Sequence, residues 1–218
     1  MAGLGTLRKR HLYKAIRWAT ITVAKHEDFR IVHFSIQSNH IHLLVEASGQ
    51  AALSRGMQAF QISAAKHINR AIAERTGEPR RRGKVFADRY HKRELKTPRE
   101  VRHALAYVLN NWRRHEEDRA DFTKTWKLDP YSTAVDFGGW KELADSPFLY
   151  RPPPTYEGMI VWLPKTWLLQ KGWQKHGLIS VFDVPGPAPA SRLTPRTSRI
   201  SRRSRRAPRD ASRSRSEN

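Results

Sequence analysis

The chain of 218 residues contains no cysteine. This absence excludes a disulfide framework and any zinc site built on thiolates, so a bound metal would need His, Asn, Gln, Asp or Glu as ligands. Long apolar runs are also missing: the stretch 159–163 is far shorter than the roughly 20 apolar residues that cross a bilayer, and no apolar segment of the signal-peptide type follows the first basic residues. We therefore expect a cytoplasmic protein.

Acidic residues are scarce. The chain has 20 Asp and Glu against 41 Lys and Arg, which gives a formal net charge of +21. A charge of this size indicates a polyanionic partner. Nucleic acid is the first candidate and an anionic membrane surface the second. Because apolar segments that could enter a bilayer are lacking, we expect nucleic acid and no membrane.

Apolar residues make up 39% of the chain and are concentrated before residue 187. The composition predicts a catalytic domain over 1–150 and, after a proline-rich break, a Trp-rich extension over 151–186 that forms a short helical pair. Residues 187–218 consist mainly of Pro, Ser and Arg. Such a segment cannot bury enough apolar surface to offset the entropy of ordering, so we predict a disordered basic tail.

Hydrophobic periodicity predicts the secondary structure of the first 115 residues. In chain order, we expect a helix over 7–26, strands over 30–37 and 40–47 joined by a turn at 38–39, a helix over 50–75, a third strand over 85–95 and a helix over 97–115. The last helix has the clearest start, because Thr97 can cap, Pro98 suits the first helical position and Glu100 completes a capping box. These elements indicate an α+β domain.

Two histidines stand two residues apart in the second predicted strand. Side chains alternate across a strand, so His40 and His42 share one face, whereas Ile41, Leu43 and Val45 share the face expected to meet the core. Two imidazoles so placed can chelate one ion, and an open site of this kind suits Mg²⁺ or Mn²⁺. The alternative is an exposed strand face that holds two histidines without a role.

The helix predicted over 97–115 carries a tyrosine away from its apolar stripe, which consists of Val101, Leu105, Val108 and Trp112. At about 100° per residue, Tyr107 lies nearly opposite this stripe. One interpretation is an ordinary surface tyrosine. The other is a nucleophile, which would need activation because free tyrosine ionises near pH 10. Asn111 follows one turn later and could supply a third ligand to a metal.

These residues resemble a known family. The His-Ile-His motif at 40–42, followed by Tyr-Val-Leu-Asn-Asn at 107–111, resembles the single-tyrosine HUH nucleases, named for the pattern His, hydrophobic residue, His. The chain is most similar to insertion-sequence-200-like transposases of the branch associated with repetitive extragenic palindromes. The segments 83–90 and 129–132 are also similar to family segments. The likeness covers roughly 10–140.

The resemblance implies a ferredoxin-like antiparallel sheet with helices on one face. Relatives begin with a strand before the first helix, and this chain would lack that strand. The family's reaction implies that Tyr107 attacks a phosphodiester of single-stranded or hairpin DNA and forms a 5′-phosphotyrosine, after which the DNA is rejoined. His40, His42 and Asn111 would hold Mg²⁺ or Mn²⁺. The tyrosine helix could act within a subunit or across a homodimer.

Basic residues between the predicted elements are expected to position the DNA: Arg80, Arg81, Arg82, Lys84, Arg89 and Arg93. The Arg-rich tail would bind phosphates without sequence preference. Three other interpretations stay open: a non-catalytic DNA-binding remnant of a transposase, a relaxase or replication initiator, and an RNA-binding protein. The absence of a helicase domain disfavours the second, and the lack of strand aromatics at RNA-recognition spacing disfavours the third.

Overall fold

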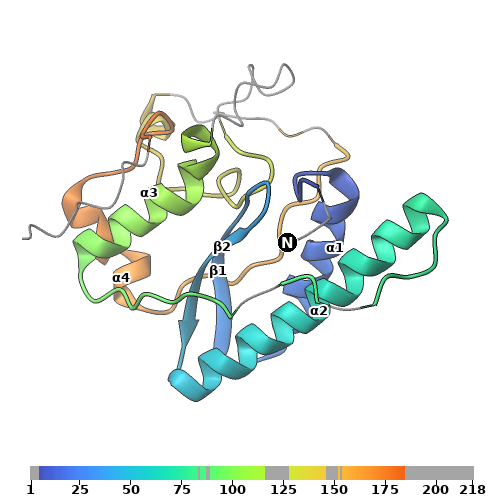
Figure 1. Ribbon diagram of the computed structural model, residues 1–218. Coiled ribbons are helices and arrows are strands. Elements are labelled where there is room, and N and C mark those ends of the chain that lie inside the picture. Colours follow the sequence, from blue (N-terminus) through green and yellow to red (C-terminus); the bar gives the residue numbers. More distant parts are fainter. Residues whose placement is uncertain are drawn as a thin grey trace, which may run out of the picture. The chain divides into compact units, whose positions relative to one another are not determined.

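The computed structural model (Figure 1) describes residues 5–82, 84–86, 89–115, 128–145, 152 and 154–184. The chain divides into two units, 1–186 and 187–218, and every described residue belongs to the first. The predicted disordered tail lies outside the described residues. Within the described part, no helix is both long and apolar enough to span a membrane.

A β-hairpin lies in the middle of this unit. Strand β1 (Phe29–Ile36) pairs antiparallel with β2 (Ile41–Ala47), and the register is interrupted between Ile31 and His33. The turn closes where the Gln37 amide donates to the His40 carbonyl at 2.9 Å. Both strands and the turn agree with the sequence prediction, whereas residues 5–9, before the first helix, form no strand.

Helices cover both faces of the hairpin. Helices α1 (Arg10–Val23) and α2 (Gln50–Thr76) form one apolar cluster with β1, and α3 (Pro98–Arg114) belongs to a second cluster on the other face (Figure 1). The expectation of helices on one face is therefore wrong. The physical reason is that the hairpin is apolar on both sides: Leu43 packs against the first cluster, while Val32 and Leu44 belong to the second.

Local signals set the ends of two helices as predicted. The Thr97 hydroxyl accepts from the Glu100 amide at 3.2 Å, and the Glu100 carboxylate accepts from the Thr97 amide at 3.1 Å. This reciprocal pair is the predicted capping box at the start of α3. Helix α2 ends at Gly77, whose φ of 71° lies in the left-handed region that glycine tolerates best.

The prediction of a third strand over 85–95 is wrong for every residue of this range that the structure describes. Residues 85–86 and 89–95 form no strand. The segment is instead anchored by its side chains: Val85 is buried in the first cluster, and the Tyr90 hydroxyl lies 3.4 Å from that of Ser54 on α2. An extended, apolar-rich sequence can therefore run along a helix without pairing in a sheet.

The Trp-rich extension forms the predicted short helical pair, α4 (Trp167–Gln170) and η4 (Gly172–His176), and a further short 3-10 helix, η3 (Lys141–Ala144), precedes it in the chain. The segment after η4 lies along α3. Arg102 donates to the carbonyls of Gly177 and Leu178, and Asn110 donates to that of Ser180. Helix α3 is thus held between the hairpin and the extension.

Candidate active site

The two predicted histidines are in direct contact. Nε2 of His40 lies 2.9 Å from Nε2 of His42, and Nδ1 of His40 lies 2.7 Å from Oδ1 of Asn39. If Nδ1 of His40 donates to Asn39, its Nε2 is left as an acceptor, which is the form that a metal ligand takes. Neighbouring octahedral ligands at about 2.1 Å from an ion stand roughly 3 Å apart. The spacing of the pair therefore fits one shared cation.

Both imidazoles are held in the neutral form. Burial, together with smaller contributions from the nearby His40 and His115, lowers the pKa of His42 to about 4. Burial also lowers the pKa of His40, with a smaller contribution from His115. Neutral imidazole is the form that binds metal ions, so the pair is available for this purpose at neutral pH.

Tyr107 lies beside this pair. Its ring centroid is 5.0 Å from that of His42, and the Arg114 guanidinium is 5.9 Å from the same tyrosine ring. The contact arises because α3 packs on the hairpin face that also presents His42. Glu46 follows His42 on β2 by four residues. Tyr107 is partly buried.

Asn111 occupies the turn of α3 after Tyr107. Its side chain is fully buried, and neither its Nδ2 nor its Oδ1 has a hydrogen-bond partner among the described residues. One turn further on, the ring of His115 lies 5.7 Å from that of His40. Residues at i, i+4 and i+8 share a helix face, so Asn111 lies on this face between two residues that contact the His pair.

The available donors are therefore two imidazoles and one amide. No group of three His, Cys, Asp or Glu side chains in the described part of the chain could hold a metal ion. The Asn111 amide nevertheless fits a ligand role, because a buried amide normally has partners and a carbonyl oxygen suits Mg²⁺ or Mn²⁺. Asn39 and His115 were not predicted from the sequence as part of this site. The spacing of His115, eight residues after Tyr107, was the signal that could have found it.

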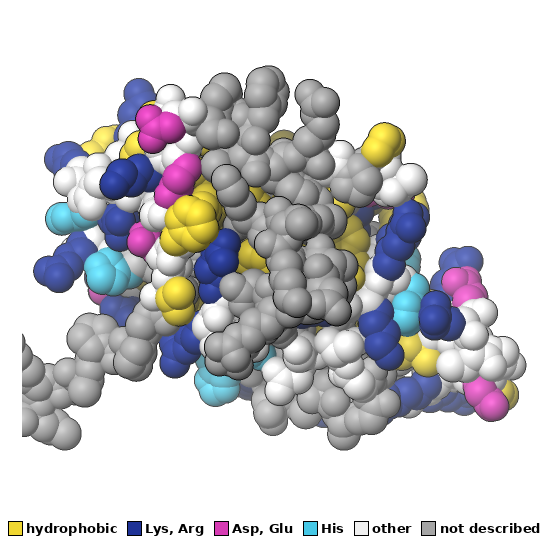
Figure 2. Space-filling view, turned by 90° about the horizontal axis from the view of Figure 1, so that it is seen from above, with side chains coloured by type: hydrophobic (Ala, Val, Ile, Leu, Met, Phe, Trp, Pro, Cys, Tyr) yellow, Lys and Arg dark blue, Asp and Glu magenta, His cyan; other side chains and the backbone are white. Residues whose placement is uncertain are grey.

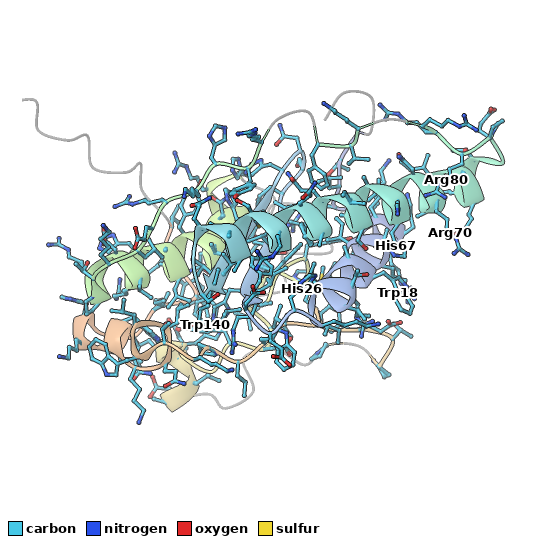
Figure 3. The ribbon with its side chains drawn as sticks, turned by 90° about the horizontal axis from the view of Figure 1, so that it is seen from below. Trp18, His26, His67, Arg70, Arg80 and Trp140 are labelled. Carbon is cyan, nitrogen blue, oxygen red and sulfur yellow. The ribbon has the colours of Figure 1, made fainter. Side chains whose placement is uncertain are left out.

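The predicted DNA-binding residues gather in a hollow of about 1090 Å³ between α2 and the loop that follows it. Its cationic lining consists of Lys66, Arg80, Arg81, Arg82, Lys84 and Arg89. Among the described residues no acidic side chain lines the hollow, and Ile62, Val85 and Phe86 contribute to its apolar part. Figure 3 labels Arg80 near the end of α2. Arg93 does not line the hollow, and its guanidinium pairs with Glu100 at 3.0 Å.

Positive side chains are also spread over the face seen in Figure 2, where Lys and Arg are more widespread than Asp and Glu among the coloured residues. The tail arginines, by contrast, lie outside the described residues, and so do Gly83, Ala87 and Asp88 of the 83–90 segment.

The 129–132 segment has a structural role. Asp129 is buried and forms a two-pronged pair with Arg8, with N–O distances of 2.8 and 3.0 Å. The Tyr131 carbonyl accepts from the Ile36 amide at 2.9 Å. The segment therefore ties the chain before α1 to the end of β1, next to the turn that precedes His40.

Comparison with known proteins finds a family whose model matches part of the chain. Residues 6–111 match the model of a family described as "Transposase IS200 like". No curated protein and no solved structure matched the chain. The matched region runs from just before α1 to Asn111, so it includes the His pair and Tyr107 but ends before the 129–132 segment and the extension. Over these residues the chain is similar to the IS200-like transposases, which supports a transposase role.

Proposed function

We propose that the chain cuts and rejoins single-stranded or hairpin DNA with Tyr107 as the nucleophile. The observation that carries this proposal is the contact of the Tyr107 ring with His42, whose Nε2 is 2.9 Å from that of His40. The Tyr107 oxygen would form a bond to phosphorus while the bond from phosphorus to the 3′ oxygen breaks. The phenol proton leaves to solvent or a base, and the 3′ oxygen takes one up. Reversal of this transesterification rejoins the strand without ATP.

His40, His42 and Asn111 would hold Mg²⁺ or Mn²⁺ at this place. When bound, the cation supplies charge that polarises the scissile phosphate. The protein's own residues prepare the site: Asn39 orients His40 through the 2.7 Å contact, and burial keeps both imidazoles neutral. The Arg114 guanidinium beside the Tyr107 ring adds positive charge where the phosphate would arrive.

The basic hollow would hold part of the DNA away from the point of cleavage. Its cations come from α2 and from 80–89, and the described residues of its lining include no carboxylate that would repel a phosphate. Lys and Arg contacts to phosphate position a nucleic acid, and base contacts specify its sequence. The apolar lining at Ile62 and Phe86 offers surface for the latter. In this proposal Arg93 contributes only to the general positive field, since it pairs with Glu100.

Within the family, the segments quoted from the sequence favour the branch associated with repetitive extragenic palindromes, whose substrates are hairpins. Because Tyr107 and His42 meet within a single chain, we favour a tyrosine that acts in its own subunit, and a homodimer is not required. A non-catalytic remnant is disfavoured, because a decayed site has no reason to keep Tyr107, the His pair and a partnerless buried Asn111 together.

The test is covalent capture of DNA. The wild-type chain, incubated with a hairpin oligonucleotide and Mn²⁺, should form an adduct that survives denaturing electrophoresis. Tyr107→Phe should form none while its DNA affinity stays within about twofold, because only the hydroxyl is lost. Tyr131→Phe and Tyr90→Phe are matched controls and should still form the adduct. An adduct in Tyr107→Phe would assign the nucleophile to another residue.

A further inference from the structure

Two tryptophans of the extension stand half exposed. Trp162 is 47% and Trp167 50% exposed, although Trp173 of the same segment is buried. Residues 159–178 contain no Asp or Glu, and their cations are Lys165, Lys171 and Lys175. Exposed aromatic rings among cations, in a segment that itself contains no acidic residue, are typical of surfaces that bind single-stranded nucleic acid.

The Trp167 ring is held in a fixed orientation. It lies against Gly172 so closely that a methyl group there would come within 2.7 Å of a ring carbon. The Lys175 ammonium lies 5.0 Å from the ring centroid. The Thr166 hydroxyl accepts from the Leu169 amide and caps the short helix that carries the ring. A ring fixed in this way loses little freedom when a flat group stacks on it.

The turn that carries the ring is tied to the strands of the candidate active site. The Glu46 carboxylate of β2 accepts from the backbone amides of Lys165 and Thr166, both at 2.8 Å. The Trp162 amide donates to the Ile31 carbonyl of β1 at 2.8 Å. Glu46 stands four residues after His42 on the same strand, a rise of roughly 13 Å. A DNA strand at the His pair could therefore extend to this surface.

We infer that Trp162 and Trp167, with the three lysines, form a second contact surface for single-stranded DNA, here called the Trp–Lys surface. Unpaired bases would stack on the rings and phosphates would pair with the ammonium groups. The inference takes its ligand, DNA, from the proposed function, but the surface is distinct from both the Tyr107 site and the basic hollow. An anionic membrane is a poorer fit, because α4 is a single turn and lacks the length of an interfacial amphipathic helix.

The experiment measures binding of an unstructured thymidine oligonucleotide by the full chain carrying Tyr107→Phe, which prevents cleavage. Trp162→Ala and Trp167→Ala should each raise the dissociation constant about tenfold, since stacking on one aromatic side chain changes affinity by roughly 5- to 150-fold. Phe at either position should recover part of the loss. The matched control is Trp18→Ala on α1, where Trp18 is 54% exposed and stacks on His67 (Figure 3). This change should leave the dissociation constant unaltered.

A salt series gives an independent readout that does not alter the rings. Replacing Lys165, Lys171 and Lys175 together with Gln should reduce the slope of log K against log salt by about 2, because each phosphate contact to a single strand contributes about 0.7. Binding of blunt duplex DNA should respond to these lysine changes but not to the Trp changes, because paired bases cannot stack on the rings.

Three results would overturn the inference: unchanged oligonucleotide affinity in the folded Trp and Lys variants, Trp-dependent binding to phosphatidylglycerol vesicles in place of DNA, or Trp-dependent self-association in sedimentation. Folding of each variant is checked by circular dichroism, and the exposed Lys variants keep the test valid if a Trp→Ala variant unfolds. Failure of the proposed function would give a different result. The wild-type chain would form no covalent adduct, while its affinity for the oligonucleotide would still depend on Trp162 and Trp167.

Discussion

Replacing Asn111 with leucine is expected to stabilise the protein while it abolishes DNA cleavage. The amide is fully buried, and its two polar atoms have no hydrogen-bond partner among the described residues. Each such group costs about 1–3 kcal/mol, so removing both gains roughly 2–6 kcal/mol. The leucine side chain is larger than that of asparagine, and its overpacking in the core costs about 1 kcal/mol of this gain. A net gain of about 2 kcal/mol would raise the melting temperature by roughly 4–8 °C.

The assay is urea unfolding in EDTA, followed by the fluorescence of buried tryptophans, with adduct formation measured in parallel. The matched control is Asn110→Leu. Asn110 is equally buried, but its Nδ2 donates to the Ser180 carbonyl at 2.9 Å, so its loss should destabilise by about 1–3 kcal/mol. Added Mn²⁺ should stabilise the wild type by mass action and Asn111→Leu much less. If the two leucine variants lose stability equally, Asn111 has a structural partner and the ligand interpretation is refuted.

Three further predictions follow from individual contacts and charges. Burial lowers the pKa of His33 from 6.5 to about 4, so between these pH values the unfolded chain binds a proton that the folded chain does not. Stability should fall with falling pH across this window, and His33→Gln should reduce the slope by up to about 1.4 kcal/mol per pH unit in urea titrations. Thr97→Ala should cost about 1 kcal/mol in thermal melts and Thr97→Ser very little, because only alanine removes the cap of α3; equal losses would contradict this. Deleting residues 187–218 should weaken binding to cognate and scrambled hairpins alike, whereas changing residues 80–82 to Gln should reduce the discrimination between them in a salt series; the opposite assignment of effects would refute this division of roles.

The sequence alone determined the features that depend on neighbouring residues. Strand alternation placed His40 and His42 on one face, and the structure confirms their contact. The start of α3 follows from Thr97 and Glu100, three residues apart, and the end of α2 from Gly77. These signals are hydrogen bonds and backbone conformations that involve only residues within one helical turn. They are therefore nearly independent of the rest of the chain.

Only the tertiary structure decided which surfaces meet. The stretch 85–95 has strand-like composition, but a strand forms only where the segment pairs with the edge of a sheet. Side chains of this stretch pack on α2 instead. The contact of His115 with His40 and the burial of Asn111 depend on α3 lying across the second face of the hairpin. Hydrophobic periodicity shows that a face is buried but does not identify its partner, because the partner is set by packing between segments far apart in the chain.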